Sequence, residues 1–80
     1  MSIPSTARSV SVKTDLEGIG QRIRALRGSL LQEDLANYLG ISQGQLSKIE
    51  RGKLAPTAEI LIRLVKRFGK TADWILMGQN

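Results

Sequence analysis

Apolar residues recur along most of this chain at intervals of three and four, the spacing that lines up side chains on one face of an α-helix. From residue 16 to residue 27 the apolar stripe consists of Leu16, Ile19, Ile23 and Leu26. Residues 57 to 68 repeat the pattern with Ile60, Leu61, Leu64, Val65 and Phe68. Each segment is therefore predicted to form an amphipathic helix that packs on a common core.

Glycines separate these segments and predict where the helices end. Five of them follow an apolar-periodic stretch, where a helix commonly ends in a left-handed residue: Gly28, Gly40, Gly52, Gly69 and Gly78. These stops predict about five helices. Thr57 and Thr71 are predicted N-caps of the last two, since an acid that suits the helix dipole follows each. The only alternating stretch, residues 10 to 12, is too short for a sheet, so the expected fold class is all-α.

Residues 32 to 51, QEDLANYLGISQGQLSKIER, contain two shorter apolar stripes. The inward positions are Leu35 and Leu39 in the first piece and Leu46 and Ile49 in the second. Gly40 lies between the pieces and supplies the turn residue that a helix-turn-helix link requires. The segment therefore predicts two short helices that cross steeply.

Further details of this segment support the same geometry. Ala36 is small at the position where two crossing helices would collide, and Ile41 fills the corner between them. Ser42 followed three residues later by Gln45 is a capping-box signature. The second helix is therefore predicted to begin at Gln43.

The outward face of this second helix differs from an ordinary solvated face, which is rich in Glu and Lys. Gln43 lies at its exposed tip, and the other outward residues are Gly44, Ser47, Lys48 and Arg51. The face is polar, mostly uncharged and rich in amides. Gly44 leaves a gap in it, although glycine disfavours a helix.

Composition limits the chemistry that the chain can perform. With 80 residues it is expected to form one small domain, and its single Trp, Tyr and Phe predict an aliphatic core. The lack of cysteine and histidine excludes disulfides, zinc sites of the usual kind and histidine-based catalysis. The 7 acidic residues are scattered over cap and surface positions, which argues against an enzyme.

Charge and patterning suggest a partner and a location. The net charge of +5 and a pI near 10.3 favour an acidic partner, with nucleic acid as the leading candidate. No apolar run has the length of a membrane span or the form of a signal peptide, so a cytoplasmic protein is expected. Residues 1 to 15 are rich in Ser and Thr without a helical period and are expected to be a flexible arm, followed by a domain over residues 16 to 80.

Three segments, IGQRIRALRGSL, QEDLANYLGISQGQLSKIERGKLAP and TADWILMG, resemble the Cro/repressor-type helix-turn-helix family, which is XRE-like or lambda-repressor-like. The resemblance runs from about Gly18 to Gly78. It implies a five-helix domain whose second and third helices form the DNA-binding unit, with the third in the major groove. The implied function is sequence-specific regulation of transcription, as a repressor that binds a palindromic operator in double-stranded DNA as a homodimer, without a cofactor.

The resemblance also implies roles for individual residues. Gln32 would open the second helix, bind a phosphate and brace Gln43. The implied base-reading positions are Gln43, Gly44 and Lys48, and those near the groove edge or the DNA backbone are Gln45, Ser47, Arg51 and Lys53. Arg27 and Glu50 would form a structural ion pair.

The last helix is open to two interpretations. Its apolar residues, which either close the core or form a dimer interface, are Trp74, Ile75, Leu76 and Met77. Four consecutive apolar residues cover more of a short helix than one core can accept. The family resemblance implies that this region forms the dimer.

The sequence departs from the family pattern at two positions. Leu31 stands where Ser or Thr usually caps the second helix, and Ser29 is an alternative cap for a helix that begins earlier. Gly44 stands where a side chain commonly reads bases. The alternative function is a protein-docking module such as an antitoxin or anti-repressor, and activation is the alternative to repression. The chain is expected to be either a stand-alone regulator or the N-terminal domain of a longer repressor.

Overall fold

The computed structural model describes residues 14 to 78, and all regular secondary structure in that range is helical. The helices are α2 (Leu16–Arg27), α3 (Gln32–Leu39), α4 (Gln43–Glu50), α5 (Ala58–Phe68) and α6 (Ala72–Met77). The predicted all-α class and the five helices are thus confirmed. The expected flexible arm lies outside the described residues, except for its last two positions.

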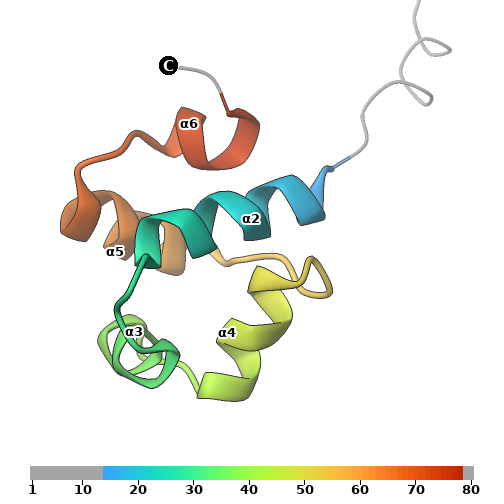
Figure 1. Ribbon diagram of the computed structural model, residues 1–80. Coiled ribbons are helices and arrows are strands. Elements are labelled where there is room, and N and C mark those ends of the chain that lie inside the picture. The colour runs from blue at the N-terminus through green and yellow to red at the C-terminus, as the bar shows by residue number, and fades with distance from the viewer. Residues whose placement is uncertain (1–13, 79–80) are drawn as a thin grey trace, which may run out of the picture.

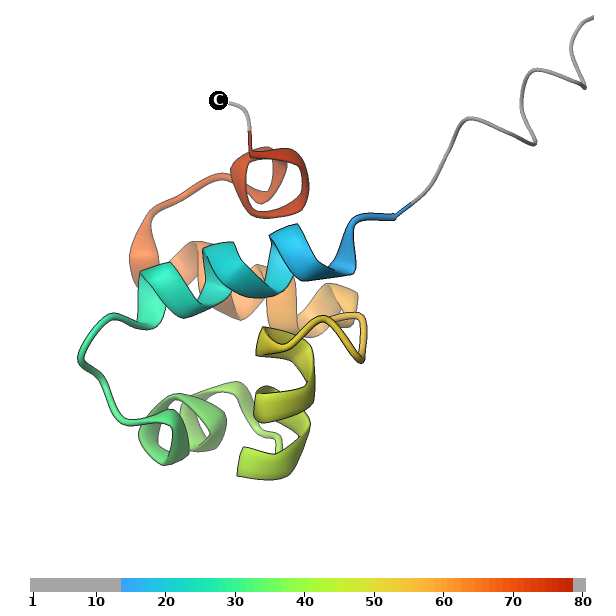
Figure 2. The same ribbon diagram turned by 45° about the vertical axis from the view of Figure 1, so that its right-hand side comes forward.

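Helix α2 occupies the centre of the domain. In Figures 1 and 2 it crosses the middle of the molecule, with α6 above it, α3 and α4 below it and α5 behind it. Its two sides pack on α4 and on α6. Within residues 14 to 78, no helix combines the length and the apolar character that crossing a membrane requires.

The core between these helices is aliphatic, as the composition predicts. All five helices contribute to its fully buried side chains, which are Ile23, Leu35, Leu46, Ile49, Leu64 and Ile75. Phe68 and Trp74 are partly buried and pack at its edge. Each fully buried leucine or isoleucine contributes roughly 1.5–3 kcal/mol, and these gains offset the conformational entropy that the chain loses on folding.

Local hydrogen bonds set most of the helix starts. The predicted caps Thr57 and Thr71 accept from the amides of Ile60 and Trp74, at 3.2 and 3.0 Å. Helix α3 begins at Gln32 behind Leu31, which makes no side-chain capping bond. The alternative earlier start with Ser29 as its cap is therefore not adopted.

Close packing between α2 and the end of α4 depends on one glycine. A Cβ atom on Gly20 would lie 2.5 Å from the carbonyl oxygen of Glu50 and closer still to that of Ile49. Backbone therefore packs directly on backbone at this crossing. The hydrophobic pattern does not single out Gly20, because its requirement comes from a helix about thirty residues away.

An ion pair joins the same two helices. The guanidinium of Arg27 donates from Nε to Oε2 of Glu50 at 2.7 Å and from Nη2 to Oε1 at 3.0 Å. The side chains are only 16% and 4% exposed. The hydrogen bond to Glu50 raises the pKa of Arg27 against the opposing effect of desolvation, so Arg27 stays protonated. The pair that the family resemblance implies is present in the structure.

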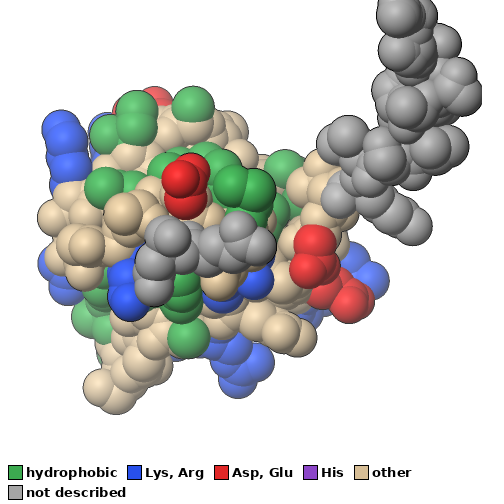
Figure 3. Space-filling model, turned by 90° about the horizontal axis from the view of Figure 1, so that it is seen from above, with side chains coloured by type: hydrophobic (Ala, Val, Ile, Leu, Met, Phe, Trp, Pro, Cys, Tyr) green, Lys and Arg blue, Asp and Glu red, His purple; other side chains and the backbone are tan. Residues whose placement is uncertain are grey.

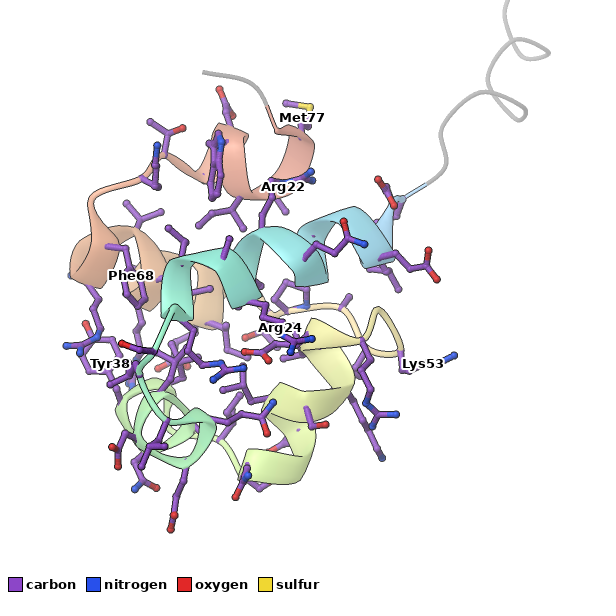
Figure 4. All side chains as sticks on the ribbon, viewed as in Figure 1. Arg22, Arg24, Tyr38, Lys53, Phe68 and Met77 are labelled. Carbon is purple, nitrogen blue, oxygen red and sulfur yellow. The ribbon has the colours of Figure 1, made fainter. Side chains whose placement is uncertain are left out.

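The short helix α6 is held against α2 by an arginine. Arg22 donates from Nε to the carbonyl oxygen of Ile75 at 2.8 Å and from Nη2 to that of Leu76 at 3.0 Å. Figure 4 shows this side chain between the two helices. The last carbonyls of a helix lack partners within it, and Arg22 supplies donors for two of them. No local pattern in the sequence indicates this role, because the partners of Arg22 lie 53 and 54 positions away.

The four apolar residues of α6 differ in how far they are buried, which bears on whether each closes the core or is free to form a dimer interface. Ile75 is fully buried in the core of its own chain, which agrees with the interpretation that this residue closes the core. Trp74 is partly buried, and the ammonium of Lys70 lies 4.9 Å from its ring centre. Leu76 and Met77 are 36% and 61% exposed. Within α6, the apolar surface that the core does not use therefore lies mainly at the end of the helix.

Replacing Gly20 by alanine should destabilise the domain by about 1–3 kcal/mol, because the added methyl group must displace backbone at the end of α4. The matched control is Gly44→Ala, where the only atom within 4 Å of the new Cβ would be the hydroxyl of Ser42 at 3.9 Å. That variant should be neutral or up to about 1 kcal/mol more stable. Urea denaturation of both variants measures the difference, and equal stability of Gly20→Ala and the unmodified protein would contradict the packing argument.

Glu50→Ala should destabilise the domain by about 3 kcal/mol or more, because it leaves the guanidinium of Arg27 buried without a counter-charge. The control is Glu59→Ala, which removes an exposed ion pair to Arg63 and should cost less than about 1 kcal/mol. Thermal denaturation of the two variants compares these losses. A melting temperature unchanged by Glu50→Ala would show that the pair contributes nothing to stability.

Candidate nucleic-acid interface

Helices α3 and α4 form a helix-turn-helix around Gly40. Gly40 has φ of 75°, a left-handed conformation that favours glycine, and Ile41 packs partly buried beside the core. Ala36 is 1% exposed and accepts a hydrogen bond from the amide of Ile41 at 3.0 Å. A larger residue at Ala36 would push the two helices apart, so the turn geometry follows from small side chains at these positions.

The start of α4 is set by reciprocal capping. The hydroxyl of Ser42 accepts from the backbone amide of Gln45, and the side-chain oxygen of Gln45 accepts from the amide of Ser42, both at 3.0 Å. The capping box that the sequence predicts is thus confirmed, and α4 begins at Gln43. The side-chain oxygen of Gln45 accepts this bond, and its NH2 group has no partner among the described residues.

A relay of hydrogen bonds reaches from the ion pair to the tip of α4. Gln32 donates from Nε2 to Oε1 of Glu50 at 3.0 Å, and its Oε1 accepts from Nε2 of Gln43 at 3.3 Å. The brace between Gln32 and Gln43 that the resemblance implies is therefore present. One proton on Nε2 of Gln43 and its Oε1 remain available, which is the donor and acceptor pair that glutamine presents to adenine.

The remaining outward residues of α4 differ in how firmly they are held. Gly44 and Lys48 are exposed, and the space beside Gly44 is open. Arg51 donates from Nε to the carbonyl oxygen and the hydroxyl of Ser47, both at 3.3 Å. Lys53 follows α4 and extends away from the body of the protein (Figure 4). The structure brings Gln32, Gln43, Ser47 and Arg51 around one hollow, whereas Gln45 lines a different hollow beside α5 and Lys53 follows the far end of α4.

The described part of the chain shows no arrangement typical of a metal centre. Among residues 14 to 78, no three His, Cys, Asp or Glu side chains come together in a way that could hold a metal ion. The acids on α3, Glu33 and Asp34, lie in its first turn, where they favour the helix dipole. The polar chemistry at the helix-turn-helix is therefore that of hydrogen-bond donors, amides and positive charge.

Comparison with known proteins agrees with this geometry. A helix-turn-helix family model matches residues 22–75. An uncharacterized HTH-type transcriptional regulator of Methanocaldococcus jannaschii is 44% identical over 57 residues, which are 71% of this chain and 85% of the relative.

Two solved structures show the same fold. The P22 c2 repressor in complex with a synthetic operator has 35% identity and a TM-score of 0.69, over 76% of this chain and 96% of the repressor chain. The restriction-modification controller protein C.AhdI of Aeromonas hydrophila has 28% identity and a TM-score of 0.67, over 76% of this chain and 96% of the controller chain.

The matched region contains all of α3, α4 and α5, and with them the residues of the relay from Arg27 to Gln43. The family model covers more than half of the chain, and the regulator of M. jannaschii exceeds 40% identity. The chain therefore belongs to the Cro/repressor-type (XRE-like) helix-turn-helix family of DNA-binding transcriptional regulators, which are not enzymes.

Proposed function

We propose that this protein is a sequence-specific repressor that occupies a palindromic operator as a homodimer. The observation that carries the proposal is the exposed tip of α4, where Gln32 orients Gln43 and leaves it a free donor and acceptor. Because the side chain of Gln43 is already oriented before binding, less conformational entropy is lost when it contacts a base. It is an arrangement suited to reading one base, and a general phosphate contact would not require it.

Contact roles follow from position on this surface. Base edges in the major groove are read by Gln43 and Lys48, with Gly44 allowing the helix tip to approach closely. Residues at the margin of the surface position the protein on the backbone or at the groove edge, and they are Gln32, Gln45, Ser47, Arg51 and Lys53. Gln32 serves twice, because it braces Gln43 and opens α3, whose first amides have no partners within the helix.

Dimerisation through the end of α6 provides the symmetry. Leu76 and Met77 are the exposed large apolar residues of this helix. Figure 3 views the molecule from the side of α6 and shows hydrophobic side chains on that face. A two-fold axis at this face would join the apolar surfaces of two copies and leave both copies of α4 free. The P22 c2 repressor has this fold and is solved in complex with a synthetic operator, which supports the proposed binding to an operator.

A salt-titrated shift assay on random duplex DNA tests this function against the docking module. Binding that weakens steeply with salt is expected of a DNA-binding protein, since Lys and Arg displace counterions from phosphates. A protein-docking antitoxin or anti-repressor would show little affinity for the duplex at any salt concentration.

Sites selected from random DNA should be near-palindromes with half-sites about 34 Å apart, because two symmetric recognition helices enter successive major grooves. Met77→Lys places a charge at the exposed end of α6 and should weaken binding to the full site while leaving half-site binding unchanged. Sedimentation of the bound species measures its stoichiometry. Asymmetric selected sites bound by a monomer would contradict the proposed homodimer.

Gly44→Ala should weaken operator binding and change the preference at one base pair in each half-site, because its methyl group enters the space beside the base edges. The open surroundings of Gly44 predict no loss of stability, so an effect of the variant on operator binding can be distinguished from an effect on folding. Binding to random DNA and its salt dependence should not change, since no phosphate contact is altered. A variant with unchanged operator affinity and base preference would show that Gly44 is only a tolerated gap in the helix.

A further inference from the structure

A polar hollow of about 480 Å³ lies beside the outward face of α4 and extends to α2. Its walls come from α2, from the start of α3 and from α4, and the lining residues are Arg24, Arg27, Leu31, Gln32, Gln43, Ser47, Glu50 and Arg51. It therefore includes the braced Gln43, and it adds Arg24, a residue outside the helix-turn-helix that no motif in the sequence singles out. Figure 4 shows Arg24 extending from α2 toward α4.

The hollow carries surplus positive charge. Three arginines and one glutamate line it, which leaves a difference of two positive charges. The carboxylate of Glu50 is not available to a ligand, because Arg27 binds both of its oxygens and Gln32 donates to one of them. The charge of Arg27 is balanced in the same pair. The unbalanced charges are therefore those of Arg24 and Arg51.

Both of these arginines have donors to spare. Within residues 14 to 78 the exposed guanidinium of Arg24 makes no ion pair and no hydrogen bond. Arg51 uses Nε to bond Ser47, while neither of its Nη atoms has a partner within the same range. Guanidinium groups match the oxygens of a phosphate with pairs of parallel hydrogen bonds. An anion between the two helices would satisfy these donors together.

We propose that Arg24 and Arg51 together hold a phosphate of the DNA backbone in this hollow. The inference rests on the proposed DNA-binding function and adds α2 to the binding surface. Because Gln43 lines the same hollow, a phosphate held there lies next to the nucleotide whose base Gln43 reads. The contact sets the register of the recognition helix on the strand, and it carries no sequence preference of its own.

Helix α2 is suited to this role because it packs closely on α4. Gly20 places the two backbones in direct contact, and the Arg27 pair ties their ends together. A phosphate bound between Arg24 and Arg51 is thus held from two helices whose separation is already set. The long, mobile side chains are the only groups that must become ordered on binding.

The test compares Arg24→Gln with Lys66→Gln, in the full chain, on random duplex DNA and on the selected operator. Both changes remove one positive charge, but Lys66 lies on α5 and outside the hollow. For Arg24→Gln the slope of log K against log salt should fall by about 0.9, as for one lost phosphate contact. Both DNAs should lose affinity by the same factor. Lys66→Gln should leave the slope unchanged, and neither change should alter the melting temperature.

Four outcomes would overturn the proposal. Equal slopes for Arg24→Gln and Lys66→Gln would show that Arg24 acts only through the long-range field. A changed base preference in Arg24→Gln would assign it to a base edge. If the unmodified protein bound duplex DNA without salt dependence, the proposed function itself would fail, whereas steep binding that is unaffected by Arg24→Gln would overturn the phosphate contact alone.

Discussion

The domain depends on one buried carboxylate. Glu50 lies at the end of α4 and accepts hydrogen bonds from Arg27 of α2 and Gln32 of α3. A charge removed from water is tolerated only when it is paired and fully hydrogen-bonded, so the three helices must meet where those donors reach it. Gln32, held in this way, orients Gln43 at the exposed tip. Stability and the orientation of Gln43 therefore depend on the same group.

Helix α2 connects the helix-turn-helix to α6 on the opposite side of the molecule. One side of it packs on α4 through Gly20 and Arg27, while Arg22 binds the end of α6 on the other. A helix as short as α6 has little stability of its own, and its position depends on this tertiary contact. A rigid link between the tip of α4 and the end of α6 would set the spacing of two half-sites in the proposed dimer.

Local chemistry explains why so much of the fold could be predicted. Thr57, Thr71 and the pair Ser42 and Gln45 cap helices through bonds spanning three residues, so the sequence contains both partners side by side. Apolar periodicity likewise depends only on neighbours along one helix. The outward face of α4 follows from the same periodicity, since it consists of the positions left over once the inward face is assigned.

Sequence by itself determined the five helices, their main caps, the aliphatic core and the polar outward face of α4. Only the tertiary structure decided that Gly20 must lack a side chain, that Arg22 binds α6, that Ile75 is buried and that Arg24 shares a hollow with Arg51. The pairs Gly20 and Glu50, Arg22 and Ile75, and Arg24 and Arg51 are each 27 or more positions apart in the printed sequence, and no local pattern encodes such pairings. The physical reason is that packing and electrostatic contact depend on distance in space, which is defined only once the helices have taken their positions.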